Sequence, residues 1–238
     1  MVDGFDAALN ATAKIEGWMT DAQARRLWDR AVDLRPGDQI VEIGSFRGRS
    51  TVILASAAPV GVDLVAIDPH AGNDRGPQEI RGFEEAAAVD HDVFHENLRD
   101  AGVDHRVRHA RSFSHEALGA IDGDVELLYI DGAHRYGPAL ADIRAWGGRV
   151  APGGTMLVHD SFSSVGVTLA ILRALTFGFR FRYVGRSGSM VEYRRELVAG
   201  RNRVRNTTAQ LAELPWFARN LVIKVLIVLR LKRGPWPY

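Results

Sequence analysis

The 238-residue chain has no cysteine. It can therefore form no disulfide, no thiolate metal site and no cysteine nucleophile. The H-E-x-x-H zinc motif is also absent. We expect four of the eight histidines to lie at surface positions of polar helices and loops: His91, His95, His105 and His115.

Long hydrophobic runs are missing as well. The longest apolar stretch, residues 221–231, is interrupted by Lys224 and Arg230, whereas a helix that crosses a bilayer needs about 20 apolar residues. The first ten residues carry two aspartates and no basic cluster ahead of an apolar run. We therefore expect no secretory signal and a cytoplasmic protein.

Net charge is nearly absent, because the formal value is only +1, but the two signs are unevenly distributed. Residues 194–238 hold ten lysines and arginines against two acidic residues, a net charge of +8. The 193 residues before them hold 20 basic and 27 acidic residues, a net charge of −7. We therefore expect a globular domain over residues 1–195 and a basic tail over residues 196–238.

Short apolar segments alternate with helical patterns along most of the chain. The strand-like segments are residues 39–43, 62–67, 106–109, 125–130, 155–158, 181–184 and 189–193. The helical patterns are residues 20–34, 50–58, 93–101, 136–146 and 165–176. This alternation predicts an α/β fold with a doubly wound, mostly parallel, Rossmann-like sheet. The last two strands are predicted to pair antiparallel across a glycine turn.

The residues that follow the first two strands are typical of a nucleoside site. Gly44 and Gly48 allow a tight turn close to a ligand, and Asp68 can accept from both ribose hydroxyls. Dinucleotide sites use a G-x-G-x-x-G pattern, which this turn does not have. The preceding Glu42 would repel a pyrophosphate, but it suits a ligand with an ammonium and a sulfonium group. This favours S-adenosylmethionine over NAD.

Four segments in order carry a family resemblance: VEIGSFRGRST (41–51), AID (66–68), LYIDGAHRY (128–136) and PGGTMLVHD (152–160). Over residues 39–193 the chain resembles class I S-adenosylmethionine-dependent methyltransferases, in particular the sugar and natural-product O-methyltransferases with an Ile-Asp-Gly-x-His signature. The resemblance implies a seven-stranded sheet with an antiparallel last strand. It also implies a set of cofactor-binding residues: Glu42, Gly44, Ser45, Gly48, Ser50, Asp68, Ser112, Phe113 and Asp131.

Methyl transfer to oxygen needs an in-line approach and an acceptor hydroxyl that is losing its proton. His134 and Asp131 directly follow a buried strand, and the resemblance implies that His134 is the catalytic base and that Asp131 acts beside it. Asp160 ends the next strand, so Asp131 and Asp160 form a candidate carboxylate pair for Mg²⁺. Related metal-dependent enzymes have a further acidic or amide residue here, whereas this chain has His159 and Ser161. A metal-free site and a helix-capping role for His134 remain open.

The basic tail contains a predicted amphipathic helix over residues 216–231. Its polar positions fall on one face: Arg219, Asn220, Lys224 and Arg230. Such a helix fits peripheral membrane contact through residues 216–233, packing on the catalytic domain, or a homodimer interface. Nucleic acid is disfavoured as a partner, because no binding motif occurs and the body of the chain is acidic.

The sequence therefore predicts an S-adenosylmethionine-dependent O-methyltransferase that acts on a hydroxyl of a small molecule, a glycan or a glycolipid. One alternative is an NAD-dependent oxidoreductase, which the glycine spacing disfavours. Another is a non-catalytic, membrane-associated protein that binds a nucleoside. The loops between the motifs determine the acceptor, so the motifs leave it open.

Overall fold

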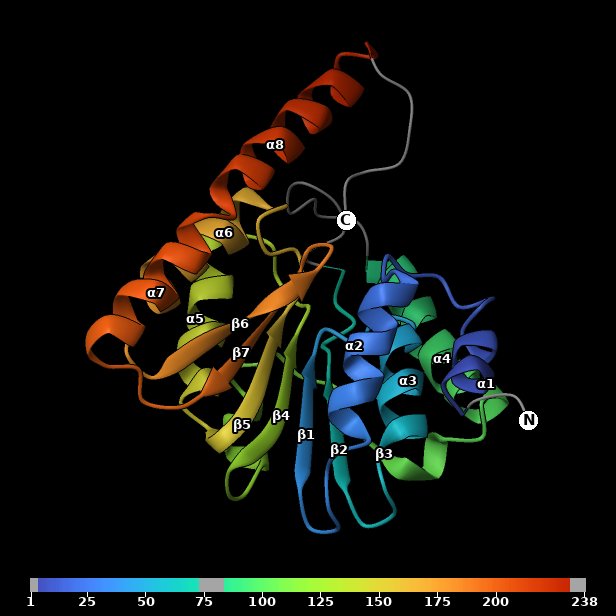
Figure 1. Ribbon diagram of the computed structural model, residues 1–238. Coiled ribbons are helices and arrows are strands. Elements are labelled where there is room, and N and C mark those ends of the chain that lie inside the picture. Colours follow the sequence, from blue (N-terminus) through green and yellow to red (C-terminus); the bar gives the residue numbers. More distant parts are fainter. Residues whose placement is uncertain (1–3, 73–83, 232–238) are drawn as a thin grey trace.

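A seven-stranded sheet forms the centre of the protein (Figure 1). The computed structural model describes residues 4–72 and 84–231. The strands are β1 (Gln39–Ile43), β2 (Asp63–Ile67), β3 (Val107–Ala110), β4 (Val125–Ile130), β5 (Val150–Val158), β6 (Phe181–Ser187) and β7 (Met190–Arg195). Their order is β3-β2-β1-β4-β5-β7-β6, and β7 runs antiparallel to both of its neighbours. The predicted mostly parallel, Rossmann-like sheet is confirmed.

Helices cover both faces of this sheet (Figure 1). The first face carries α1 (Gly4–Ala11), α2 (Asp21–Ala31), α3 (Arg49–Ala57) and α4 (Glu84–Asp100). The second carries α5 (Tyr136–Gly147), α6 (Val165–Ile171), the short helix η3 (Leu172–Thr176) and α7 (Gly200–Leu211). Strand residues alternate between two apolar cores, so Ile40 joins the first and Val41 the second. Strands buried on both faces explain the continuous apolar segments of the sequence.

The start of α2 follows the predicted capping pattern. The Thr20 side chain accepts from the backbone N–H of Gln23, and the Gln23 side chain accepts from the backbone N–H of Thr20 at 2.8 Å. This reciprocal pair satisfies two amide donors that the first turn of a helix leaves free. The helix ends three residues before the predicted limit of residue 34. The prediction for α4 was too short, because the helix already begins at Glu84.

The tail begins as part of the main body. In α7 the buried Asn206 side chain accepts from the backbone N–H of Tyr183 at 2.7 Å and donates to the carbonyl of Phe181. One turn later, the buried Gln210 accepts from the hydroxyl of Tyr193 at 3.0 Å. These bonds to the last two strands fix α7 in place, so it packs as part of the cover of the sheet.

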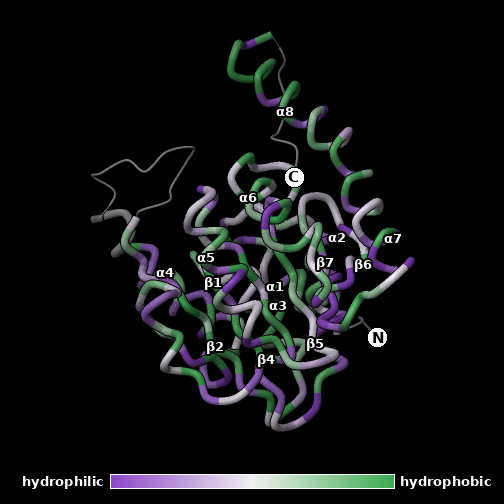
Figure 2. The backbone as a smooth tube through the Cα atoms, turned by 90° about the vertical axis from the view of Figure 1, so that its left-hand side faces the viewer, coloured by the Kyte–Doolittle hydropathy of each residue, from purple (hydrophilic) through white to green (hydrophobic). Residues whose placement is uncertain are grey.

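Helix α8 (Leu214–Val228) projects from the body beyond the carboxyl ends of the strands (Figure 1). Its first turn packs on the second core, whereas Val222, Val225 and Val228 are more than half exposed. Figure 2 shows that the projecting helix is mainly hydrophobic. Within the described residues, no helix combines the length and hydrophobicity that a membrane crossing requires.

The polar stripe predicted on α8 is divided between two directions. Asn220 is fully buried and donates to the carbonyl of Phe162 at 3.2 Å, and the Lys224 ammonium donates to the carbonyl of Ser163 at 2.8 Å. Arg219 and Arg230 are exposed. Half of the predicted polar positions thus bond backbone carbonyls of the body, and the other half face outward.

Candidate active site

The turn after β1 lies against the turn after β4. Gly44 has a positive φ of +87°, and a Cβ added there would lie 2.4 Å from the backbone oxygen of Asp131. Only glycine permits both this conformation and this approach. The chain leaves β1 toward one side of the sheet and β4 toward the other, which is the position where such sheets bind ligands.

Glu42 is completely buried beneath this turn. Thr51 donates its hydroxyl to Glu42 Oε2 at 2.5 Å, and the Ser50 hydroxyl donates to Oε1. Burial raises the pKa of Glu42 to about 7, although the two hydroxyl bonds oppose the rise. The sequence indicated direct cofactor contacts for Glu42 and Ser50, whereas here they bind each other. Both carboxylate oxygens of Glu42 thus anchor the first turn of α3.

The neighbouring Ser45 presents a buried hydroxyl that has no hydrogen-bond partner among the described residues. Gly48, the last predicted glycine of the turn, caps α3 with a φ of +86°. Its backbone N–H donates to the carbonyl of Ser45 at 2.8 Å. The turn is therefore closed by its own backbone, and the free Ser45 hydroxyl suits a ligand.

Asp68, after β2, is held by two backbone amides. Phe46 N donates to Oδ2 and His70 N donates to Oδ1, both at 2.8 Å. A carboxylate accepts about four hydrogen bonds, so each oxygen retains a lone pair for a ribose hydroxyl. Ser112 and Phe113 follow β3, where Phe113 stacks on His115 and is 37% exposed. An exposed aromatic face at this edge suits an adenine ring.

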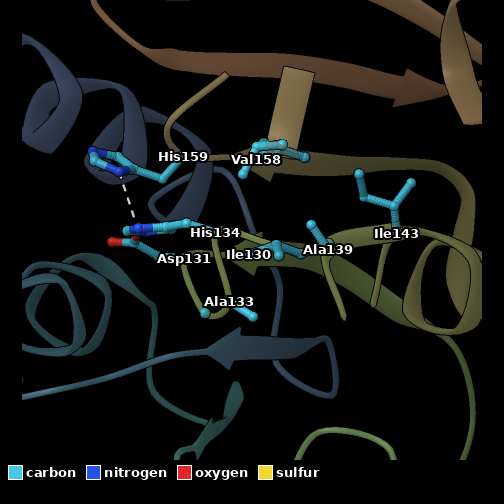
Figure 3. A pocket seen from close by; sticks show the side chains of 10 residues that line it. Ile130, Asp131, Ala133, His134, Ala139, Ile143, Val158 and His159 are labelled. Carbon is cyan, nitrogen blue, oxygen red and sulfur yellow. Dashed lines mark ion pairs between the residues drawn. The ribbon is translucent and has the colours of Figure 1, made fainter. Parts of the chain in front are cut away.

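A buried histidine joins the two carboxylates at the ends of β4 and β5. His159 Nδ1 lies 3.1 Å from Asp131 Oδ1 and 3.9 Å from Asp160 Oδ2. Tyr129 donates its hydroxyl to Asp131 Oδ2 at 2.9 Å. Burial lowers the pKa of His159, but the charges of Asp131 and Asp160 outweigh it and raise the value to about 9. His159 is therefore an imidazolium at neutral pH, and Figure 3 shows it beside Asp131.

His134 lines a pocket together with Asp131 and His159 (Figure 3). Its Nε2 is 3.0 Å from Asp160 Oδ2, and its side chain is 43% exposed while that of Asp160 is 9% exposed. Its backbone carbonyl accepts from the Ser164 hydroxyl at 3.1 Å. A Cβ on Gly166 would lie 2.2 Å from that carbonyl, so α6 packs directly beneath the loop. The histidine is thus both solvent-accessible and held by a carboxylate.

A Mg²⁺ ion at the predicted carboxylate pair would share most of the oxygens with protein groups. Asp131 Oδ2 accepts from Tyr129, and Asp131 Oδ1 lies beside His159. Asp160 Oδ2 lies beside His134 and His159, whereas Asp160 Oδ1 has no partner among the described residues. The positive charge of His159 opposes a second cation here, so these residues do not support the Mg²⁺ prediction.

The structure brings the residues predicted at the β1 and β4 ends into one site. Asp131 and His134 are linked through Asp160 and His159, and Asp131 touches the turn at Gly44. The sequence prediction did not assign a role to His159. The sequence did show that His159 stands beside Asp160 where metal-dependent relatives have an acidic or amide residue. Only the surrounding charges, which the fold assembles, reveal that it is a cation.

Comparison with known proteins identifies the family of the chain. A family profile described as a methyltransferase domain matches residues 41–161, about half of the chain. The chain belongs to this methyltransferase family. The matched segment contains most of β1, all of β2 to β5, and the site at the ends of β1 and β4, whereas β6 and β7 follow it.

Solved structures of similar fold include three methyltransferases. An O-methyltransferase from Bacillus cereus in complex with S-adenosylhomocysteine has 17% identity and a TM-score of 0.58, with 81% of this chain and 90% of that chain covered. TomG from Streptomyces achromogenes, an O-methyltransferase of tomaymycin synthesis in complex with S-adenosylmethionine, has 18% identity, a TM-score of 0.56 and coverage of 83% and 90%. The methyltransferase PaMTH1 of Podospora anserina, bound to S-adenosylhomocysteine, has 16% identity, a TM-score of 0.58 and coverage of 82% and 89%.

Proposed function

We propose that this methyltransferase uses S-adenosylmethionine to methylate a hydroxyl oxygen of a small molecule, a glycan or a glycolipid. The observation that carries the proposal is the exposed His134, held at 3.0 Å by Asp160 beside the turn of Gly44 and Asp131. Structural neighbours that bind S-adenosylmethionine or its product support the choice of cofactor. When bound, the cofactor supplies a methyl group on a sulfonium, which leaves as a thioether.

His134 removes the proton of the acceptor hydroxyl. Its Nε2 faces Asp160, so we assign the Nε2–H donor to that carboxylate, which leaves Nδ1 as the basic nitrogen. As the acceptor oxygen forms its bond to the methyl carbon, the hydroxyl proton passes to His134 Nδ1. Asp160 stabilises the imidazolium that results, as a carboxylate does in other histidine dyads.

His159 acts as a positioning residue in this scheme. Its positive charge lies between Asp131 and Asp160 and offsets the repulsion between their carboxylates. Asp160 can therefore stay close to His134.

We also propose that the acceptor is amphiphilic and is reached at a membrane surface. Helix α8 contacts Phe162 and Ser163, immediately after Asp160, and turns an exposed apolar face outward. Residues 214–231 contain no acidic side chain, and Arg219 and Arg230 are exposed. An apolar face with flanking cations matches the interface of an anionic membrane. Residues 232 and 233 of the predicted contact lie outside the described residues.

The test of the catalytic assignment is His134→Gln, with labelled S-adenosylmethionine and a panel of hydroxylated acceptors. We expect kcat to fall about 100-fold or more, with cofactor binding unchanged, because general base catalysis contributes about 10²- to 10⁴-fold. The matched control is His105→Gln, since the side chain of His105 is 72% exposed on another element. An unchanged kcat in His134→Gln would reject the base, and transfer to no hydroxyl in the panel would argue against an O-methyltransferase.

A further inference from the structure

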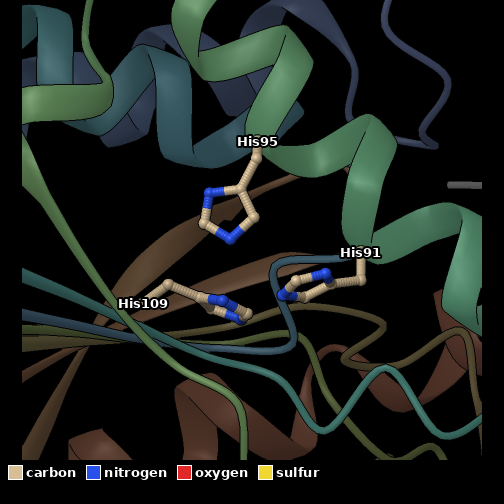
Figure 4. Close-up of side chains that lie close together, drawn as sticks. All are labelled: His91, His95 and His109. Carbon is tan, nitrogen blue, oxygen red and sulfur yellow. The ribbon is translucent and has the colours of Figure 1, made fainter.

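Three histidines that the active site does not use face one another between α4 and β3. His91 and His95 lie one turn apart on the same side of α4, and His109 meets them from β3 (Figure 4). One ring nitrogen from each lies within 4.8 Å of the others. The ring centroids are 4.8 to 5.4 Å apart. The i, i+4 spacing on a helix places two imidazoles side by side, as helical zinc sites require.

His109 contributes a buried nitrogen that is available to a ligand. Its Nε2 has no hydrogen-bond partner in the described part of the chain. A buried polar atom of this kind is costly unless a ligand or a water satisfies it.

His91 has a carboxylate partner for one of its ring nitrogens. Its Nδ1 lies 3.3 Å from Asp92 Oδ1, which leaves Nε2 as the free nitrogen. Metal-bound histidines usually direct their second nitrogen to a carboxylate or a carbonyl in this way. The metal binds the neutral form of imidazole, which has a free lone pair.

A fourth histidine closes the cluster on the side of the methyltransferase site. The His70 ring centroid is 5.4 Å from that of His91 and 5.2 Å from that of His109. His70 Nε2 lies 2.8 Å from the carbonyl of Phe46, and its Nδ1 is buried without a partner among the described residues. The cluster is thus shielded behind the loop that holds Asp68.

We propose that His91, His95 and His109 bind one divalent transition-metal ion of the Zn²⁺ class. Three imidazoles and no thiolate or carboxylate among the ligands favour Zn²⁺ and its first-row neighbours over Mg²⁺ or Ca²⁺. A tetrahedral Zn²⁺ at about 2.1 Å from each nitrogen needs nitrogens about 3.4 Å apart, so small side-chain rotations close the site. The ion joins α4 to β3.

The metal site does not depend on methyl transfer, because none of its three ligands belongs to the proposed catalytic set. It meets the cofactor site at His70, whose ring packs on His91 and His109 and whose backbone N–H donates to the Asp68 carboxylate. The ion therefore has a structural role at the edge of the sheet. Zinc binding and cofactor binding can be measured separately.

The test uses the full chain without a purification tag, stripped by chelator and titrated with Zn²⁺ against a chromophoric competitor. We expect one ion per chain and a higher Tm on binding. His91→Ala and His95→Ala should each weaken binding more than about tenfold, since changes even beyond the direct ligands cost 10- to 100-fold. Both positions are partly exposed helical sites, where alanine suits the helix, and the metal-free Tm of each variant confirms that it is folded.

The control is His105→Ala, which changes a histidine outside the cluster and should bind Zn²⁺ as the parent does. The Co²⁺-loaded protein should show the visible bands of tetrahedral coordination without thiolate charge transfer. The proposal is overturned if the parent chain binds no stoichiometric Zn²⁺, or if folded His91→Ala and His95→Ala bind it as tightly as the parent.

Discussion

Replacing His159 by glutamine removes the buried cation and with it a defined dependence of stability on pH. In the unfolded chain an imidazole loses its proton near its ordinary pKa of 6.5, whereas His159 in the fold keeps it to about 9. Between these values the folded state binds more protons than the unfolded state, so the free energy of unfolding falls as pH rises. The contribution is complete below pH 6.5 and is lost as pH rises through 9.

The magnitude follows from the shift. One pKa unit corresponds to about 1.4 kcal/mol, so the whole contribution is about 3 kcal/mol, of which about 2 kcal/mol is lost between pH 7 and pH 9. Other groups with a shifted pKa change the free energy of unfolding mainly outside the range from pH 7 to pH 9. Glu42, whose pKa rises from 4.5 to about 7, lowers stability between those values, and His109, at about 3, acts below pH 6.5. Groups common to both proteins cancel when the variant is subtracted.

The assay is urea unfolding of the parent and of His159→Gln at half-unit steps from pH 7 to pH 9. The parent should lose about 2 kcal/mol more than the variant over this range, and the control His105→Gln should follow the parent. Glutamine retains a side-chain donor, so the variant should stay folded at pH 7. Equal slopes for parent and variant would refute the assignment of His159 as an internal cation.

Two further predictions concern the turn and the projecting helix. Gly44→Ala should lose cofactor binding and destabilise the fold by more than the roughly 1 to 2 kcal/mol that a left-handed conformation costs. The control Gly37→Ala, at a φ of +94° with no atom within 4 Å of the added Cβ, should show the conformational cost alone. Equal losses of stability in thermal unfolding would disprove the contact between Gly44 and Asp131. The parent chain should sediment with anionic liposomes at low salt, and Val225→Glu, which alters an exposed position, should abolish this binding without changing the fold. The proposal that α8 binds a membrane is rejected if the intact chain does not bind the liposomes. It is also rejected if the chain forms a dimer that Val225→Glu dissociates.

The sheet was predictable because its signals are local and repeated. Strands that are buried on both faces appear in the sequence as continuous apolar runs. Thr20 and Gln23, three residues apart, predict the start of a helix. The order of the strands required the family resemblance, since short runs alone do not specify their neighbours. The extent of α4 was missed because its first turns carry few apolar residues in a helical pattern.

The site was predictable only where chemistry follows directly from the strand ends. Asp68 and His134 follow their strands, so their place at the cleft could be inferred. The charge of His159 could not, because it results from two carboxylates that the fold brings within 4 Å. His91 and His95 carried a usable signal in their i, i+4 spacing, but their partner His109 lies on a strand and becomes adjacent only in the fold.

The most direct test of the central claim is calorimetric titration of the full chain with S-adenosylhomocysteine, with NAD as the comparison ligand. The account predicts saturable binding of one S-adenosylhomocysteine per chain and none of NAD. It also predicts that Asp68→Ala weakens this binding while His105→Ala leaves it unchanged. Absence of S-adenosylhomocysteine binding by the folded parent chain, or binding of NAD in its place, would contradict the account.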